Sequence, residues 1–304
     1  MSGLTLAIDL GGTQVRTALV DGAGKIIKRA SDSTDVRGGP RAVLAQMRRL
    51  AKEAGFDAAR KAVKAVGISA PGPLDIEKGT VIAMPTLPGW QDFPLRQAVG
   101  DEFGLPAILE NDGIAAVYGE WKFGAGLGFS HLVYVTISTG IGGGVVADGK
   151  LLHGRQGMAG HIGHMMIARD GPRCGCGGTG CFEALASGTA LGHAARARGF
   201  ADAASMVEAA RAGNAVALAL LDDEADILGY GFASLLYLYS PERLIIGGGV
   251  AAALDLMLAR IRARIDGLAM APFRAADIVS AALGGNAGLV GAAGLAANAS
   301  FRNA

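Results

Sequence analysis

Residues 4–20 read LTLAIDLGGTQVRTALV: an apolar run that ends on Asp9, a Gly11-Gly12-Thr13 turn, and a second apolar run. Apolar runs rich in β-branched residues and bounded by glycine predict two strands joined by a turn. Asp21-Gly22 then supplies hairpin chemistry before a short strand at residues 25–27. We therefore expect the chain to begin with three consecutive strands.

The same order of features returns at residues 131–153. HLVYVTIS is followed by the glycine-rich stretch TGIGGG at residues 139–144, then VVA, Asp148-Gly149 and KLL. Two copies of one supersecondary unit indicate two similar lobes. The alternative is a chance likeness between two glycine-rich hairpins.

Further strands and helices are expected between and after these copies. The pattern predicts helices at residues 41–54 and 112–118 and strands ending at Ile68, at residues 107–109 and near Leu244; a glycine-rich loop at 283–288 precedes a final helix. Strands that alternate with helices indicate an α/β fold with sheets covered on both faces. The uncharged stretch 227–240 is shorter than the ~20 residues that span a bilayer, so we expect a buried helix there.

Composition indicates a folded protein with a sizeable core. The chain has 304 residues, of which 51% are hydrophobic and 18% charged, and its 48 glycines follow no collagen-like period. A formal net charge of +1 gives no electrostatic reason to expect nucleic acid or a membrane as partner. The N-terminal residues lack a signal-peptide pattern, and three clustered cysteines fit a reducing compartment, so we expect a cytoplasmic protein.

The two glycine-rich turns are candidates for phosphate binding. A turn without side chains lets backbone N–H groups point at phosphate oxygens, and Asp9 at the strand end suits a hydrated Mg²⁺. Hairpins use such glycines too, but the second turn at 138–144 strengthens the case. The chain has no G-x-x-x-x-G-K-[ST], and each turn joins strand to strand, which argues against a P-loop and a dinucleotide site.

Asn111-Asp112 follows an apolar strand and begins a helix. A carboxylate there lies at the carboxyl end of a sheet, where α/β proteins place ligands. Phosphoryl transfer to an alcohol needs a base on the hydroxyl. Asp is also a good helix N-cap, so the residues alone leave both roles open for Asp112.

The pattern His164-x9-Cys174-x-Cys176-x4-Cys181 predicts a metal site. Three thiols and one imidazole form a closed tetrahedral Zn²⁺ set, which would be structural rather than catalytic. These are all the cysteines of the chain. The alternative is three reduced, unligated thiols.

Taken together, these motifs resemble the ROK family (repressors, open reading frames and kinases) of the actin/hexokinase-like superfamily. The likeness covers nearly the whole chain and lies in residues 9–13, 67–73, 87–90, 110–112, 136–144 and 163–183. It implies a two-lobed actin-like ATPase (ribonuclease H-like) α/β fold with a structural zinc loop. The implied lobes are residues 1–120 with a returning helix at 286–304, and residues 121–285.

The resemblance implies an ATP-dependent hexose kinase that transfers the γ-phosphate to the 6-OH of a hexose, with glucose the first expectation. It implies that Asp112 is the base, and that sugar contacts come from Gly72, Asn111, His161, His164 and Glu183. The implied nucleotide and Mg²⁺ contacts are Asp9, Gly11, Gly12, Thr13, Thr139, Gly140, Gly247 and Gly248, and the Zn²⁺ ligands are His164, Cys174, Cys176 and Cys181. On the residues alone, Glu183 fits a helix N-terminal acid equally well, and Gly247-Gly248 the close packing of a helix on a sheet.

Three features depart from the usual family pattern, one of which is Gly113-Ile114 in place of the commoner Ala-Asn. His161 stands where many family kinases have Glu, and His-Ile-Gly-His is the form found in bacterial N-acetylmannosamine kinases; Thr86 stands where Asn is usual. An imidazole can donate a hydrogen bond where a carboxylate only accepts. N-acetylmannosamine kinase is therefore the alternative activity, followed by an inactive sugar-binding protein. The expected partners are a hexose or 2-acetamido-hexose and a second copy of the chain, in a homodimer or homotetramer.

A family repressor is the alternative from a different class. Such repressors carry a helix-turn-helix domain ahead of the Asp-Leu-Gly-Gly-Thr motif, which begins here at Asp9. We therefore expect no DNA-binding domain and no nucleic-acid partner.

Overall fold

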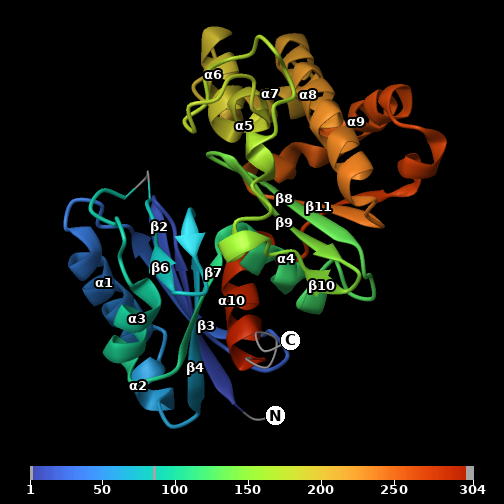
Figure 1. Ribbon diagram of the computed structural model, residues 1–304. Coiled ribbons are helices and arrows are strands. Elements are labelled where there is room, and N and C mark those ends of the chain that lie inside the picture. Colours follow the sequence, from blue (N-terminus) through green and yellow to red (C-terminus); the bar gives the residue numbers. More distant parts are fainter. Residues whose placement is uncertain (1–2, 85–86, 299–304) are drawn as a thin grey trace. The chain divides into compact units, whose positions relative to one another are not determined.

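The computed structural model describes residues 3–84 and 87–298. Thr86 and residues 299–304 of the expected terminal helix lie outside the described residues. The chain forms two compact units, one of residues 1–128, 151–160 and 285–304, and the other of residues 129–150 and 161–284 (Figure 1). Each unit is built on a five-stranded sheet.

The sheet of the first unit has the strand order β3-β2-β1-β4-β7. Its strands are β1 (Leu4–Leu10), β2 (Gln14–Val20), β3 (Ile26–Ser33), β4 (Val63–Ala70) and β7 (Ala107–Asn111). The first three form an antiparallel meander, and β4 and β7 run parallel to β1. A two-stranded sheet of β5 (Leu74–Asp75) and β6 (Thr80–Val81) accompanies it.

Helices cover both faces of this sheet. The helices are α1 (Gly39–Glu53), α2 (Phe56–Ala59), α3 (Leu95–Phe103), α4 (Asp112–Phe123) and α10 (Ala287–Ala297), with a short 3₁₀ turn η1 (Arg155–Gly157). Since side chains alternate along a strand, Leu6 and Ile8 of β1 pack with the α1 and α3 side, while Ala7 packs with Leu289 of α10. Figure 1 shows α1 and α3 on one side of the sheet and α10 on the other.

The glycine excess has a structural use between α4 and α10. A Cβ on Gly291 would lie 1.7 Å from the carbonyl oxygen of Ala115, and one on Gly67 would lie 2.0 Å from that of Ala292. No side chain fits at such distances, so these backbones approach each other only because the positions are glycine. Helix α10 thereby packs closely on α4 and β4.

The second unit repeats the topology of the first. Its sheet order is β10-β9-β8-β11-β12, again an antiparallel meander followed by two parallel strands. The strands are β8 (Leu132–Ile137), β9 (Ile141–Ala147), β10 (Lys150–Leu151), β11 (Arg243–Gly247) and β12 (Asp277–Ser280). The repeated unit predicted from residues 4–27 and 131–153 is therefore present in both sheets.

Most helices of the second unit follow β9. They are α5 (Phe182–Ala186), α6 (Gly188–Ala197), α7 (Ala203–Arg211), α8 (Ala215–Tyr239) and α9 (Leu254–Leu268), with 3₁₀ turns η2 (Ile162–His164), η3 (Gly249–Ala253) and η4 (Ala271–Ala275). Ahead of α10, η5 (Gly284–Asn286) belongs to the stretch predicted as a loop, and α10 already begins at Ala287.

The expectation of a buried helix at residues 227–240 was only half right. The stretch is helical, as part of α8, but Tyr230, Tyr237 and Leu238 are 45%, 42% and 63% exposed. One face of α8 packs inward and the other meets solvent. No single helix among the described residues is long and apolar enough to cross a membrane; α7 and α8 pass that test only as a pair bent by 113°.

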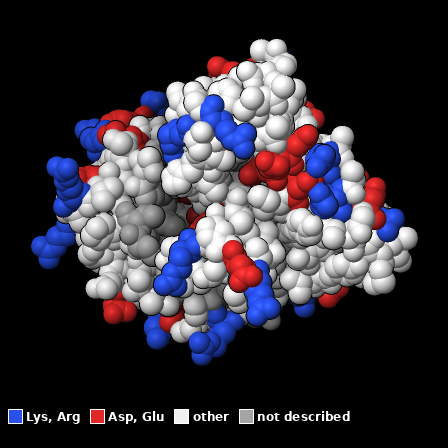
Figure 2. Space-filling model, turned by 90° about the horizontal axis from the view of Figure 1, so that it is seen from above, with Lys and Arg blue, Asp and Glu red and all other residues white. Residues whose placement is uncertain are grey.

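Charged side chains of both signs are interspersed on the face drawn in Figure 2. This mixture agrees with the small formal net charge of +1.

Candidate functional site

A row of polar residues crosses the sheet of the first unit. The register pairs Asp9 of β1 with Arg16 of β2 on one side and with Ser69 of β4 on the other, and Ser69 with Glu110 of β7. Paired residues on neighbouring strands point to the same face of a sheet. Four polar side chains from four strands therefore share the face that α10 covers.

Asp9 is the centre of this row. Its carboxylate lies 2.8 Å from Nη2 of Arg16 and accepts a hydrogen bond from Oγ of Ser69 at 2.8 Å. Burial raises the pKa of Asp9, while Arg16 and Ser69 act in the opposite direction. A Cβ on Gly288 would lie 3.2 Å from Oδ1 of Asp9, so the start of α10 lies directly over the carboxylate. Asp9 is thus a buried carboxylate with one cationic partner and one hydroxyl donor.

Asp112 is the first residue of α4, but it is not the residue that caps the helix. Asn111 has the extended backbone of an N-cap, and its Oδ1 accepts from the N–H groups of Gly113 (3.0 Å) and Ile114 (3.4 Å). The N-cap alternative for Asp112 was therefore wrong. Asn111 caps through its oxygen, which leaves its amide NH₂ available as a donor.

The Asp112 carboxylate has an unusual acidity. Burial, followed by the negative charge of Asp9, raises the pKa of Asp112 to about 6, against the effect of hydrogen bonds such as the one from the N–H of Gly113 at 2.8 Å. A carboxylate whose pKa lies near 6 is a stronger base than an ordinary Asp and is still ionised at neutral pH. This combination suits a general base.

The other predicted residues of the first unit lie at the same carboxyl edge. The Gly11-Gly12-Thr13 turn connects β1 to β2 and is closed by a hydrogen bond from the N–H of Gly11 to the carbonyl of Gln14 at 2.9 Å. Gly72 follows the end of β4, whose last residue, Ala70, pairs with Asn111. The first unit thus brings together Asp9, the Gly11–Thr13 turn, Asn111 and Asp112.

Reasoning from the sequence missed the partners that hold these groups. Arg16 and Ser69 are paired with Asp9 across the sheet, a signal that only the strand register reveals. Glu110 is 1% exposed, accepts from the N–H of Asn111 at 3.0 Å, and lies 3.0 Å from Nε2 of His153. Nothing in the sequence pattern singles out His153.

The predicted metal ligands meet in the second unit. The ligand atoms of His164, Cys174, Cys176 and Cys181 all lie within 4.8 Å of one another. Sγ of Cys174 lies 3.8 Å from Nδ1 of His164, and the Sγ atoms of Cys176 and Cys181 are 3.7 Å apart. Tetrahedral Zn²⁺ with Zn–S bonds of about 2.3 Å places its sulfur ligands about 3.8 Å apart, so the cluster fits the ion.

The Cys181 thiol is a weak acid when no cation is bound. Burial and the neighbouring thiols raise the pKa of Cys181 to about 12, so three thiolates do not coexist here without a cation. Nδ1 of His164 faces Cys174, which leaves its Nε2 for another partner. Four ligands complete a tetrahedron, so a zinc ion at this site has a structural role.

Glu183 links this cluster to the second glycine-rich turn. Its Oε2 accepts from the N–H of Ile141 at 2.9 Å, and its Oε1 lies 3.8 Å from Sγ of Cys174. A Cβ on Gly140 would lie 2.2 Å from Oε2 of Glu183, so a side chain at this position would displace the carboxylate. Glu183 also stands in the first turn of α5, as the helix-acid alternative required.

The remaining residues of the second unit divide into two groups. The turn at Thr139 is held by Thr189, whose Oγ1 donates to the carbonyl of Thr139 at 2.7 Å. Cβ atoms on Gly247 and Gly248 would lie 2.1 Å from the hydroxyl oxygen of Tyr134 and 2.3 Å from the carbonyl of Ile137. The packing alternative for these glycines thus has direct support, although their contact is with β8 rather than with a helix.

His161 lies at the start of η2, with its ring stacked on that of His164 at 6.3 Å between centroids. Both rings are exposed. The second unit therefore brings together the Cys/His cluster, His161, Glu183 and the turn at Thr139-Gly140.

A family model described as the ROK family matches residues 5–299. The chain belongs to the ROK family. A glucokinase of Thermotoga maritima is 36% identical to this ROK protein over 308 residues, which cover 95% of the chain and 96% of the relative. An N-acetylmannosamine kinase of Escherichia coli O157:H7 is 36% identical over 296 residues, covering 96% and 98%.

The solved structures agree with the family and the fold. The ROK family glucokinase of Streptomyces griseus, solved in complex with glucose and AMPPNP, superimposes with a TM-score of 0.85 at 36% identity. The match covers 97% of this ROK protein and 99% of that chain. The actin-like α/β fold expected from the sequence is thereby confirmed.

Proposed function

We propose that this ROK protein is an ATP-dependent hexose kinase that phosphorylates the 6-OH of glucose. The observation that carries the proposal is Asp112: a half-buried carboxylate at the carboxyl end of the sheet, not used as a helix cap, with its pKa raised to about 6. The near full-length similarity to glucokinases supports the choice of sugar.

In the proposed reaction Asp112 accepts the proton of the sugar hydroxyl. The hydroxyl oxygen forms the new bond to the γ-phosphorus, the bond to the β-phosphate oxygen breaks, and ADP leaves. Mg²⁺-bound ATP supplies the phosphoryl group. The amide NH₂ of Asn111 and the backbone at Gly72 orient the sugar, and backbone N–H groups of Gly12 and Thr13 bind phosphate oxygens in the turn that the N–H of Gly11 closes. Asp9 faces the magnesium side of the nucleotide.

The second unit carries the other residues that we propose as substrate contacts. Thr139 and Gly140 bind phosphate, and Gly247 and Gly248 flank the nucleoside. Nε2 of His164, the carboxylate of Glu183 and the ring of His161 contact sugar hydroxyls. A structural zinc held by His164, Cys174, Cys176 and Cys181 keeps His164 in place, because Nδ1 is directed at the cluster.

N-acetylmannosamine is the second candidate substrate, and His161 is the observation that favours it. An exposed imidazole can donate to the carbonyl of an acetamido group, whereas a carboxylate would repel it. The variant H161E tests this choice. If the imidazole selects the acetamido sugar, H161E shifts the ratio of kcat/KM toward glucose by about two- to tenfold, since one hydrogen bond contributes about 0.5–1.5 kcal/mol. An unchanged ratio would remove His161 from the specificity pocket.

The substrate is tested by an assay of the sugar phosphate formed, which detects transfer from either donor. The panel contains glucose, mannose, fructose, N-acetylglucosamine and N-acetylmannosamine, each with ATP and with polyphosphate as donor. We expect the highest kcat/KM with glucose and ATP. Highest activity with N-acetylmannosamine would establish the second candidate, and silence with every sugar would favour an inactive sugar-binding protein.

We also propose that the two compact units correspond to the two actin-like lobes, and that the protein acts in the cytoplasm as a homodimer or homotetramer. The duplicated strand order supports the first proposal. Light scattering on the eluting protein measures the oligomeric state directly, and a monomer at assay concentration would contradict that part.

A further inference from the structure

Thr34 contacts the first glycine-rich turn at two points. The residue follows β3 and is 8% exposed between two exposed neighbours. Its Oγ1 donates to the carbonyl of Gly11 at 2.6 Å, and its N–H donates to the carbonyl of Thr13 at 3.0 Å. One side chain and one backbone group of a single residue therefore hold the carbonyls on both sides of Gly12.

Fixing these two carbonyls also fixes the N–H groups of Gly12 and Gln14, which share their peptide planes. A trans peptide is planar, so the N–H of the next residue points opposite to the carbonyl. With the Gly11 carbonyl directed at Thr34, the N–H of Gly12 is directed away from Thr34. Glycine allows many backbone conformations at low cost, so a Gly-Gly turn needs an outside contact to hold one of them. Thr34 supplies that contact.

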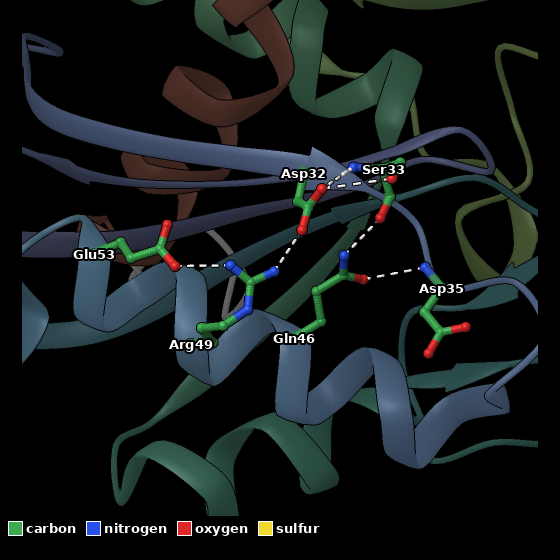
Figure 3. Close-up of polar contacts among 6 residues, drawn as sticks. All are labelled: Asp32, Ser33, Asp35, Gln46, Arg49 and Glu53. Atoms are coloured by element: carbon green, nitrogen blue, oxygen red, sulfur yellow. Dashed lines mark hydrogen bonds and ion pairs between the residues drawn. The ribbon is translucent and has the colours of Figure 1, made fainter.

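Thr34 is itself held from helix α1. Nε2 of Gln46 donates to the carbonyl of Ser33 at 2.6 Å, and Oε1 of Gln46 accepts from the N–H of Asp35 at 3.2 Å (Figure 3). In an extended chain the backbone N–H and C=O groups of residues 33 and 35 point to one side, and those of residue 34 point to the other. The Gln46 amide thus pairs with the outer edge of β3 as a neighbouring strand would, while Thr34 turns toward β2.

A salt bridge also joins α1 to β3 and serves as a comparison for the Gln46 contacts. Arg49 of α1 contacts both Asp32 (2.5 Å) and Glu53 (2.7 Å), and Figure 3 shows its guanidinium between the two carboxylates. All three side chains are about half exposed, where an ion pair contributes little. Arg49 lies one turn of α1 after Gln46. Among the hydrogen bonds of the described residues it makes none with Ser33, Thr34 or Asp35.

We propose that Thr34 is a positioning residue for nucleotide binding: it holds the Gly11–Thr13 turn in the conformation that directs its N–H groups at the phosphates, and Gln46 holds Thr34. The inference rests on the proposed function, because only a kinase with this nucleotide site gives the Gly11–Thr13 turn a role in phosphate binding. Thr34 acts through the turn and does not touch the nucleotide.

The test compares T34V, T34S, Q46M and R49Q in steady-state kinetics with ATP and with sugar as the varied substrate. T34V keeps the shape and the N–H of Thr34 but loses the Oγ1 donor, so we expect the KM for ATP to rise about 3- to 10-fold, in line with one lost hydrogen bond. We expect the KM for the sugar to stay within about twofold. We expect Q46M also to raise the KM for ATP. T34S should keep the KM for ATP near that of the wild type, and R49Q should leave it unchanged.

Calorimetric titration of Mg²⁺-AMPPNP without sugar separates this inference from the proposed function. A wild type that binds the nucleotide but phosphorylates no sugar refutes the function, and the Kd values of T34V and T34S still test the role of Thr34. An unchanged Kd in a folded T34V, equal shifts in both KM values, or failure of T34S to restore binding overturns the inference. Thermal melting of each variant confirms that it is folded.

Discussion

Oε2 of Glu110 lies 3.0 Å from Nε2 of His153, although the two residues are 43 positions apart in the chain. The contact joins the strand that ends at the proposed base to the segment that leads into His161. A second contact, from Nε2 of Gln156 to Oδ2 of Asp75 at 3.2 Å, fastens the same segment three residues later. These two contacts thus hold His153 and Gln156, which precede His161 in the chain, on the first unit.

His153→Ala should destabilise the protein. The variant removes one partner of a carboxylate that is 1% exposed, and a buried charged group that loses a hydrogen bond costs about 1–3 kcal/mol. Urea denaturation should show that loss in the free energy of unfolding. His153→Gln keeps an N–H donor and should lose less; equal stability of H153A and the wild type would contradict the role of the pair.

The pH profile of kcat/KM should fall on its acid side with an apparent pKa near 6. Burial and Asp9 raise the pKa of Asp112 to about 6, so below that pH the carboxyl is protonated and cannot accept the hydroxyl proton. The rate should drop about tenfold per pH unit below the pKa. Asp9→Asn removes the neighbouring negative charge, so the acid side of the profile should move to lower pH. An acid side that does not move would show that the charge of Asp9 does not affect the pKa of Asp112.

The same shift has a consequence for stability. Since the folded pKa of Asp112 lies above its unfolded value of 3.8, this group makes the free energy of unfolding decrease as pH rises between about 4 and about 6. Asp112→Asn removes that effect, so its thermal midpoint at neutral pH should equal or exceed that of the wild type.

Metal analysis should find one zinc ion per chain. Cys176 is exposed, so Cys176→Ser costs little packing, and any large loss of stability reports the lost ligand. We expect C176S to lose zinc and at least about 2 kcal/mol in the free energy of unfolding. Met166→Ser is the matched control, because Met166 is 77% exposed and is not a ligand. Zinc-free wild-type protein of unchanged stability would refute the site.

Short sequence patterns predicted the strands, the glycine turns and the metal-ligand cluster. Alternating apolar runs and glycine turns gave the meander of β1 and β2 and its copy in β8 and β9. The spacing of His164, Cys174, Cys176 and Cys181 predicted a cluster that the fold assembles within 4.8 Å. Helix ends were less accurate: α1 begins at Gly39, two residues before the predicted start.

What the sequence did not predict depends on the pairing of distant segments. Strand register brings Arg16 and Ser69 beside Asp9, and Glu110 beside Ser69, and the pattern of one chain does not reveal this register. The N-cap of α4 is Asn111 rather than Asp112 because Asn111 still has the extended backbone of β7 and Asp112 is already the first helical residue. The exposed Tyr237 and Leu238 of α8 contradicted a reading based on hydrophobicity alone.

Asp112→Asn tests the central claim most directly. Purified wild type and D112N are assayed for sugar phosphate formed from ATP, with the best sugar of the panel at saturation. Because Asn111 caps α4 and the substitution keeps the shape of the side chain, D112N should fold and bind zinc normally while its kcat falls by about 10²- to 10⁴-fold. Turnover close to that of the wild type in a folded D112N would contradict the assignment of Asp112 as the base.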